Sequence, residues 1–246
     1  GGSSDGGDAP TTPTGPVIVN VEGTKGLKYE LNLGGKSYSV VGIGSCKDTD
    51  ILIHSLYNEL PVTSIGYRAL YYCSSLTSVV IGDSVTTIGD DAFYECTGLT
   101  SVYINDLTAW CNIEFANAYS NPLYYANLVI NGTALGEELI LPEDLTAVSP
   151  YAFYGFKAIT SVSIHKNLAS IGKGAFAECV FLKDVYYNGI SSEKELLLEY
   201  QMLLSAYTAR KNNKNRQSVI DACSAIEICL INWIENYCKN KAITPT

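Results

Sequence analysis

A set of apolar positions recurs every 23 residues between residues 64 and 106, and this recurrence is the strongest pattern in the chain. Seven pairs of residues keep this spacing: Ile65 and Ile88, Ala69 and Ala92, Leu70 and Phe93, Cys73 and Cys96, Leu76 and Leu99, Val79 and Val102, and Ile81 and Ile104. A fixed period of this length is typical of repeat proteins. The pattern therefore predicts a solenoid in which each copy forms one coil.

Further copies follow the first two, with one interruption. The apolar positions return over residues 147–169 and 170–189, and a degenerate copy precedes the others at residues 50–66. The 60 residues from Ile88 to Val148 exceed two periods of 23 by 14 residues. We therefore expect an irregular insert within residues 107–142.

Each copy combines two kinds of local pattern. The segment from Leu76 to Ile81 alternates apolar and small or polar residues, which predicts a short strand with Val79 and Ile81 facing inward. The segment from Ala92 to Cys96 is short and suits one or two turns of α- or 3₁₀-helix. The predicted fold class is α/β, a leucine-rich-repeat solenoid over residues 47–189 with parallel strands and short helical turns.

The segments before the repeats differ from them in composition. Residues 1–16 are mainly Gly, Ser, Thr, Pro and Asp, so we expect a disordered tether. Residues 17–46 then alternate apolar and polar positions around Gly34 and Gly35, which predicts a β-hairpin with a two-residue glycine turn. Because terminal units of a solenoid must cover its open end, we interpret this hairpin as the N-terminal cap.

The segment after the repeats, residues 190–246, has a helical pattern. Ser192 and Glu195 form a capping-box signature before an apolar run, and a second apolar periodicity extends from Val219 to Tyr237. Two helices joined by a polar turn form a helical hairpin. This hairpin is predicted either to cap the last coil or to serve as a docking or dimerisation element.

The repeated pattern SxIGxxAFxxCxxLTSVxI resembles the BspA-like leucine-rich-repeat proteins over residues 28–189. This family is abundant on the surfaces of gut and oral anaerobic bacteria and occurs in some parasitic protists. The resemblance implies a cell-surface or secreted bacterial protein that binds a protein ligand, such as a host or matrix protein. It also implies a lipoprotein with a lipid anchor upstream of the given sequence, which itself contains no signal peptide.

Charge and hydropathy exclude two classes of function. The chain carries 16 basic and 25 acidic residues, a net charge of −9. Nucleic-acid binding requires stripes of Lys and Arg that neutralise phosphates, so we expect no nucleic-acid partner. No apolar run approaches the roughly 18 residues that cross a bilayer, so we expect no transmembrane segment.

Three of the eight cysteines occupy one repeat position, namely Cys73, Cys96 and Cys179, and Phe156 fills it in the remaining copy. A position that accepts Phe is a buried apolar site, so these cysteines are predicted to be free thiols in the core. No C-x-x-C pair or Cys/His cluster at zinc spacing occurs, and we expect neither a metal nor a cofactor.

The sequence offers little for catalysis. Its two histidines, His54 and His165, each follow the inward apolar end of a strand in different coils. The chain contains no G-x-S-x-G, phosphate-loop or HExxH motif. We therefore predict that the protein is not an enzyme.

The repeat instead predicts a binding surface, because the outward positions of successive strands would form one continuous concave sheet. The candidate ligand-binding residues on this sheet are Ser78, Val80, Ser101, Tyr103, Asn105, Ser161, Ser163, His165, Asp184, Tyr186 and Asn188. The insert offers an alternative site at Tyr119, Tyr124 and Tyr125. Two functions follow: a non-catalytic adhesion module for a protein ligand, or a spacer of a surface assembly, with glycan contact, that docks through the C-terminal helices.

Overall fold

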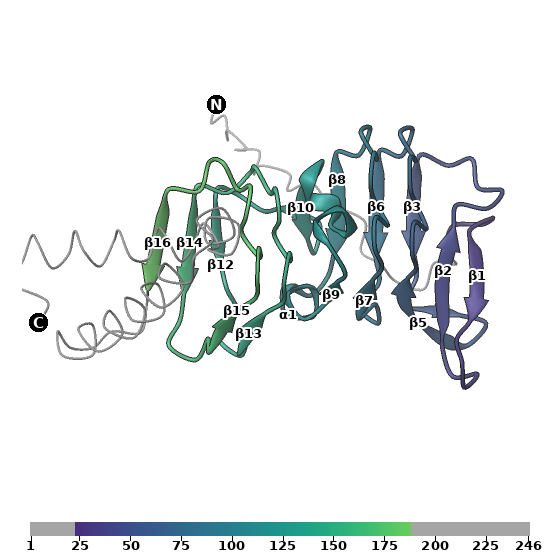
Figure 1. The fold of residues 1–246 in the computed structure, drawn as a ribbon, viewed down its shortest axis with the longest axis horizontal. Coiled ribbons are helices and arrows are strands. Elements are labelled where there is room, and N and C mark those ends of the chain that lie inside the picture. Colours follow the sequence, from purple (N-terminus) through teal and green to yellow (C-terminus); the bar gives the residue numbers. More distant parts are fainter. Residues whose placement is uncertain (1–22, 188–246) are drawn as a thin grey trace, which may run out of the picture.

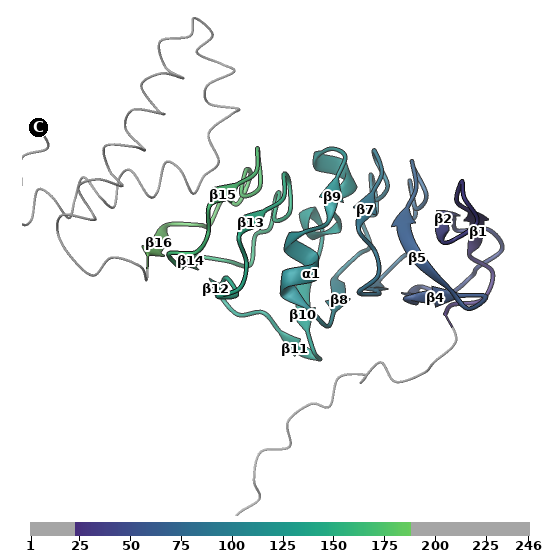
Figure 2. The ribbon, with the colours of Figure 1, turned by 90° about the horizontal axis from the view of Figure 1, so that it is seen from below.

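The computed structural model describes residues 23–187, and Figure 1 shows their strands following one another along the long axis of the molecule. The predicted tether at residues 1–16 and helical hairpin at residues 190–246 lie outside this range. The described part is a leucine-rich-repeat solenoid in which two rows of strands run side by side (Figure 2).

The first row consists of the strands that the alternating segments predict. They are β3 (Asp50–Ile53), β6 (Ser78–Ile81), β8 (Ser101–Ile104) and β10 (Asn127–Ile130), and each pairs in parallel with the next. Ile51 of β3 pairs with Val79 of β6. The degenerate copy therefore forms a coil of the solenoid, as the sequence predicts. Val79 and Ile81 are buried, which confirms their inward orientation.

The second row was not expected from the sequence. It contains β5 (Leu60–Ile65), β7 (Thr87–Ile88) and β9 (Glu114–Phe115), which also pair in parallel. β5 and β7 carry the recurring Ile before a glycine, whereas β9 has Phe115 before Ala116. Ile65 and Ile88 are buried in the same core as the first row. β4 (Leu56–Tyr57) pairs antiparallel with β5 through a two-residue turn.

An antiparallel hairpin extends the second row at its N-terminal end. β1 (Lys28–Leu31) pairs with β2 (Tyr38–Gly42), and β2 lies beside β5. The predicted two-residue glycine turn is wrong, because the main chain of Asn32 donates to Ser37 O at 2.8 Å and encloses a loop of four residues. Gly34 and Gly35 both have positive φ, which suits glycine within this longer loop.

The segments predicted to be helical are successive hydrogen-bonded turns instead. Ala92 N donates to Gly89 O, and Cys96 N donates to Phe93 O, each at 3.2 Å. Each of these hydrogen bonds therefore joins an amide to the carbonyl three residues earlier. The alternate amides donate sideways to the next coil, as Leu70 N does to Ala92 O at 2.9 Å. Hydrogen bonding between coils therefore replaces the bonds that a continuing helix would need.

The insert contributes one complete but longer coil. It contains α1 (Leu107–Cys111), the 3₁₀ helices η1 (Ala118–Ser120) and η2 (Pro122–Tyr124), β10, and β11 (Thr133–Ala134). Asn127 pairs with Ser101, so this coil places its strand 26 residues after the preceding one. β11 then pairs antiparallel with the remaining edge of β10 and ends the sheet.

A separate pair of sheets begins after β11. β12 (Glu138–Ile140), β14 (Ser161–Ile164) and β16 (Asp184–Tyr187) make one, and β13 (Ala147–Val148) and β15 (Ser170–Ile171) the other. The prediction of one continuous sheet is therefore wrong, because β11 occupies the edge that β12 would need.

Side chains of the insert connect the two parts of the solenoid where the sheets do not. Trp110 Nε1 donates to Ala152 O at 3.0 Å. Asn121 Nδ2 donates to Tyr151 O and Ala152 O at 2.6 and 2.7 Å, and its Oδ1 accepts from Leu123 N. Trp110 and Asn121 are both buried, so the core continues across the break.

Candidate functional site

The outward positions of the strands differ in how far they reach solvent. Two of the predicted residues are buried, since Ser163 is 5% exposed and His165 is 2% exposed. Asn188 lies outside the described residues. The remaining predicted side chains are exposed or partly exposed: Ser78, Val80, Ser101, Tyr103, Asn105, Ser161, Asp184 and Tyr186.

The burial of Ser163 has a local cause. Ser163 lies between Ile140 and Tyr186 in the register of neighbouring strands, and its hydroxyl donates to Glu138 Oε1 at 2.8 Å. Both large neighbours border its short side chain. Ser163 therefore exposes little surface that a ligand could contact.

His165 has a structural role in the turn after its strand. Its Nδ1 accepts from Asn167 N at 3.2 Å, and its buried Nε2 has no hydrogen-bond partner among residues 23–187. His54 makes the equivalent turn, with Nδ1 accepting from Leu56 N at 3.0 Å. Each histidine thus stabilises a turn in its own coil, as Asn and Asp commonly do.

The break in the solenoid divides the predicted concave face. Tyr103 lies on β8 and Tyr186 lies on β16, and these strands belong to different sheets. The strand pairings do not place these two rings next to each other. The two predicted aromatic anchors therefore do not share one sheet surface.

A denser group of tyrosines lies on the turns between the strand rows. We call it the tyrosine ridge and define it by Tyr71, Tyr72, Tyr94, Tyr119, Tyr124, Tyr125, Tyr151 and Tyr154. The rings of Tyr71 and Tyr94 stack with centroids 5.4 Å apart, and Tyr94 meets Tyr119 edge to face at 5.0 Å. Tyr72 and Tyr119 are 59% and 44% exposed.

The ridge continues across the insert into the second part of the solenoid. Tyr124 stacks with Tyr154 at 6.0 Å, and Tyr151 meets Tyr154 edge to face at 6.1 Å. Burial raises the pKa of Tyr154, and Glu178 and Tyr119 add smaller increases. The Tyr125 hydroxyl accepts from Glu95 N at 3.1 Å, and Glu95 directly follows Tyr94, so the two groups of rings are neighbours.

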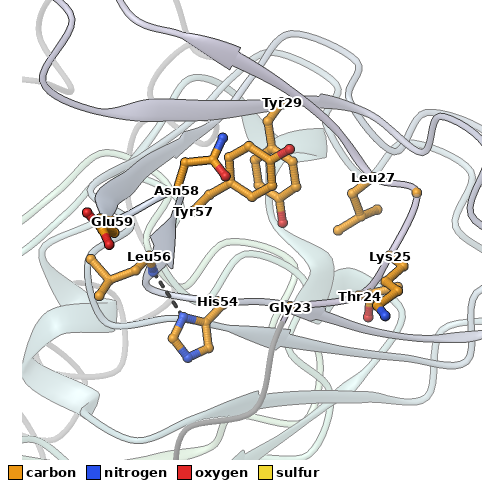
Figure 3. A pocket seen from close by; sticks show the side chains of 11 residues that line it. Gly23, Thr24, Lys25, Leu27, Tyr29, His54, Leu56, Tyr57, Asn58 and Glu59 are labelled. Atoms are coloured by element: carbon orange, nitrogen blue, oxygen red, sulfur yellow. Dashed lines mark hydrogen bonds between the residues drawn. The ribbon is translucent and has the colours of Figure 1, made fainter.

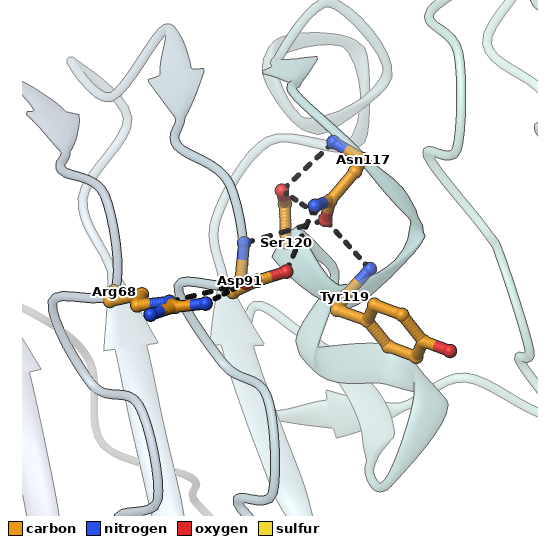
Figure 4. Close-up of polar contacts among 5 residues, drawn as sticks. All are labelled: Arg68, Asp91, Asn117, Tyr119 and Ser120. Carbon is orange, nitrogen blue, oxygen red and sulfur yellow. Dashed lines mark hydrogen bonds and ion pairs between the residues drawn. The ribbon is translucent and has the colours of Figure 1, made fainter.

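Charged side chains fix one end of the ridge. The Arg68 guanidinium lies 4.9 Å from the Tyr67 ring centroid and 4.7 Å from that of Tyr71. It also donates from Nε and Nη2 to Asp91 Oδ2, both at 3.2 Å. Asp91 Oδ1 in turn accepts from Asn117 Nδ2 at 3.0 Å, so the network joins three coils (Figure 4).

Sequence reasoning found only part of this ridge. It singled out Tyr119, Tyr124 and Tyr125 in the insert and missed the tyrosines on the repeat turns. A signal was available, because Tyr71 and Tyr94 are one 23-residue period apart.

A second concave feature lies at the N-terminal end of the solenoid. A pocket of about 560 Å³ opens between residues 23–29 and 54–59 (Figure 3). Tyr29 and Tyr57 stack beside it with ring centroids 3.9 Å apart and planes 10° from parallel. Neither the repeat pattern nor any motif predicts this pocket.

Comparison with known proteins agrees with the repeat geometry. The sequence model described as a BspA type leucine rich repeat region of 6 copies matches residues 63–193 and 109–227, more than half of the chain. The chain belongs to the BspA-type leucine-rich-repeat family. The resemblance that the repeated motif carries is thus confirmed. No curated protein matches this family member.

Several solved leucine-rich-repeat structures are similar to this BspA-type chain. One, from T. pallidum, is 22% identical with a TM-score of 0.40, over 65% of this chain and 68% of that one. A cell surface protein from Faecalibacterium prausnitzii is 21% identical with a TM-score of 0.41, over 70% of this chain and 56% of its own length. A Bacteroides capillosus protein is 20% identical with a TM-score of 0.34, over 70% and 98%.

The described residues contain no group of three or more His, Cys, Asp or Glu side chains placed to hold a metal ion. No helix within residues 23–187 is long and apolar enough to cross a membrane.

The five described cysteines, Cys46, Cys73, Cys96, Cys111 and Cys179, are all free. This agrees with the predicted thiols, although Cys73 is only partly buried.

Proposed function

We propose that this BspA-type protein is a non-catalytic binding module of the bacterial cell surface that engages a protein ligand through the tyrosine ridge. The observation that carries the proposal is the presence of two groups of contacting tyrosine rings, one from Tyr71 to Tyr119 and one from Tyr124 to Tyr154, which the hydrogen bond from Glu95 N to the Tyr125 hydroxyl links across the insert. Tyrosine provides contact area and a hydroxyl at low entropic cost, and it is enriched in protein interfaces.

The ridge is a better candidate than the strand face for two reasons. It contains large aromatic side chains in contact with one another, whereas the strand face has isolated aromatic side chains among small residues. It also crosses the break at which the strand face ends. A single ligand on the ridge would therefore touch residues from several coils at once.

The charges beside the ridge indicate the character of the ligand. The nearby carboxylate of Glu95 raises the pKa of Tyr94, and Glu178 contributes to the raised pKa of Tyr154. The whole chain carries a net charge of −9. Arg68 and Lys157 lie against the rings of Tyr71 and Tyr124, so the ridge carries both signs of charge, and its association with a charged ligand should weaken as salt increases.

The surface location is part of the proposal. Membership of the BspA-type family supports it, and one similar structure is described as a leucine rich cell surface protein. A lipid anchor upstream and a host or matrix ligand remain expectations from the family. The alternative role as a spacer, with glycan contact and docking through the C-terminal helices, depends on residues outside the described range.

The test is a binding screen followed by matched substitutions. The full chain is measured by surface plasmon resonance against purified extracellular-matrix and serum proteins. For a protein that binds, Tyr72→Ala and Tyr119→Ala on the ridge are compared with Tyr103→Ala and Tyr186→Ala on the strand face. Loss of an aromatic anchor at an interface typically costs about 1–2 kcal/mol or more.

The two surfaces give distinct outcomes. We expect the ridge variants to weaken binding by about tenfold or more, and the strand-face variants to bind normally. Loss confined to Tyr103→Ala and Tyr186→Ala would assign binding to the strand face and refute the ridge. If no protein in the screen binds, the proposal of a protein-binding module fails.

A further inference from the structure

The pocket at the N-terminal end is built from two crossing segments. Its walls come from residues 23–29 on one side and residues 54–59 on the other (Figure 3). Thr24 is fixed against β3, because its amide donates to Leu52 O at 3.0 Å and its Oγ1 accepts from Leu52 N at 2.7 Å. One wall of the pocket is therefore held by main-chain hydrogen bonds.

The pocket has a flat aromatic wall. Tyr57 is 38% exposed, stacks with Tyr29, and meets Tyr38 edge to face with centroids 5.0 Å apart. Two neighbouring rings thus restrict the orientation of Tyr57 before any ligand arrives. Leu27 and Leu56 extend the apolar lining. A rigid, partly exposed ring of this kind reduces the entropic cost of binding.

Polar groups surround this aromatic wall. His54 Nδ1 accepts from Leu56 N, so in the neutral ring the proton resides on Nε2. Neither His54 Nε2 nor the Glu59 carboxylate makes a hydrogen bond to any residue in the described range. Asn58 and Glu59 form the turn between β4 and β5 with φ of 46° and 65°, which fixes their position on the rim.

We propose that this pocket binds a saccharide. The flat face of a Tyr ring suits the CH face of a pyranose, and the rim supplies one N–H donor, one carboxylate acceptor and one amide that serves as either. The volume of about 560 Å³ lies within the range of small-ligand sites, about 300–1,000 Å³. The pocket lining includes both the Glu59 carboxylate and the Lys25 ammonium, and this polar rim disfavours a purely apolar ligand.

This inference is independent of the tyrosine ridge. No member of the ridge lines the pocket, and the pocket residues all precede Leu60 in the chain. A saccharide site would let the protein contact a glycan while the ridge contacts a protein. Failure of either proposal leaves the other standing.

Saturation-transfer NMR on the full chain tests the proposal directly. The probes are lactose, maltose, cellobiose and N,N′-diacetylchitobiose, each titrated to saturation. Tyr57→Ala removes the exposed aromatic wall. His54→Asn retains an acceptor for Leu56 N, because Asn forms the same kind of turn, and removes the Nε2 donor. Tyr67→Ala is the matched control, an exposed tyrosine that belongs neither to the pocket nor to the tyrosine ridge.

At least one disaccharide is expected to bind saturably. Tyr57→Ala should weaken it by about tenfold or more and His54→Asn by several-fold, while Tyr67→Ala binds like the parent. If Tyr57→Ala does not fold, the disaccharide affinity of His54→Asn tests the proposal instead. Absence of saturable binding by every probe, or equal binding by the parent and both pocket variants, overturns the proposal.

Discussion

The thiol of Cys96 donates a hydrogen bond to the main-chain carbonyl of Leu70 in the preceding coil, with 3.1 Å between Sγ and O. Cys179 makes the same contact with Phe153 O, also at 3.1 Å. The recurring cysteine is therefore more than an apolar filler. It links consecutive coils at a position where Phe156 contributes packing alone.

The first prediction concerns the stability that this contact provides. Cys96→Ala removes a hydrogen bond and a buried sulfur, so it should lower the free energy of unfolding by about 1–3 kcal/mol. Cys73→Ala, at the partly buried copy of the position, should cost less. Urea unfolding of both variants measures the difference, and equal losses would contradict the assigned contact.

The second prediction is a loss of stability at alkaline pH. Burial raises the pKa of Cys96 and of Cys179 to about 12, from 9.0 for an ordinary thiol. The folded state therefore keeps these protons where the unfolded state releases them, so the stabilisation is full below pH 9 and declines as pH rises toward 12.

Comparison with a double variant isolates this effect from the titration of tyrosines. Cys96→Ala with Cys179→Ala should show a shallower fall in unfolding free energy between pH 8 and pH 10.5 than the parent does. The measurement is urea unfolding at a series of pH values. Parallel curves for the two proteins would show that the thiols do not contribute.

The third prediction concerns Asp91, which bonds Arg68 and Asn117 on either side. Asp91 has φ of 55°, a conformation that Asn tolerates better than Ala. Asp91→Asn should therefore cost about 0.5–1 kcal/mol through the lost charge, and Asp91→Ala about 1 kcal/mol more through backbone strain. Thermal unfolding at low and high salt should reveal a salt dependence in the parent that Asp91→Asn reduces.

The fourth prediction uses two glycines with different surroundings. A Cβ on Gly98 would lie 2.2 Å from Ser74 O, in the main chain of the preceding coil, whereas a Cβ on Gly136 meets nothing within 4 Å. Gly98→Ala should destabilise the protein by at least about 2 kcal/mol because neighbouring coils must separate. Gly136→Ala is the control and should change the melting temperature little; a similar small effect at Gly98 would refute the close approach.

The fifth prediction tests the junction between the two parts of the solenoid. Asn121 is buried and satisfies two carbonyls and one amide through its side chain. Asn121→Ala should cost about 2–4 kcal/mol because those groups lose their partners in the core. Hydrogen exchange at Leu123 and Phe153 should accelerate first. Unchanged stability would mean that Trp110 alone holds the junction.

The sequence by itself determined the repeat, and with it the fold. The 23-residue recurrence of residues such as Val79 and Val102 specifies one strand per coil, since alternate side chains of a strand face opposite sides. Alignment of the degenerate copy with this recurrence predicted that Ile51 lies beside Val79. The recurrence also predicted buried cysteines at one repeated position of the coil. These are local periodic properties, and a single chain displays them directly.

The tertiary structure alone decided the features that depend on neighbours. The Ala92–Cys96 segment forms turns rather than a helix because its amides bond the next coil. The strand face is divided because β11 occupies the edge of β10, and Ser163 is buried between the longer side chains of its neighbours. The repeat period relates Tyr71 and Tyr94 but not the contacts that Tyr119 and Tyr154 make in the tyrosine ridge. The pocket of Tyr29 and Tyr57 likewise forms where segments distant in sequence meet, and the repeat period does not predict it.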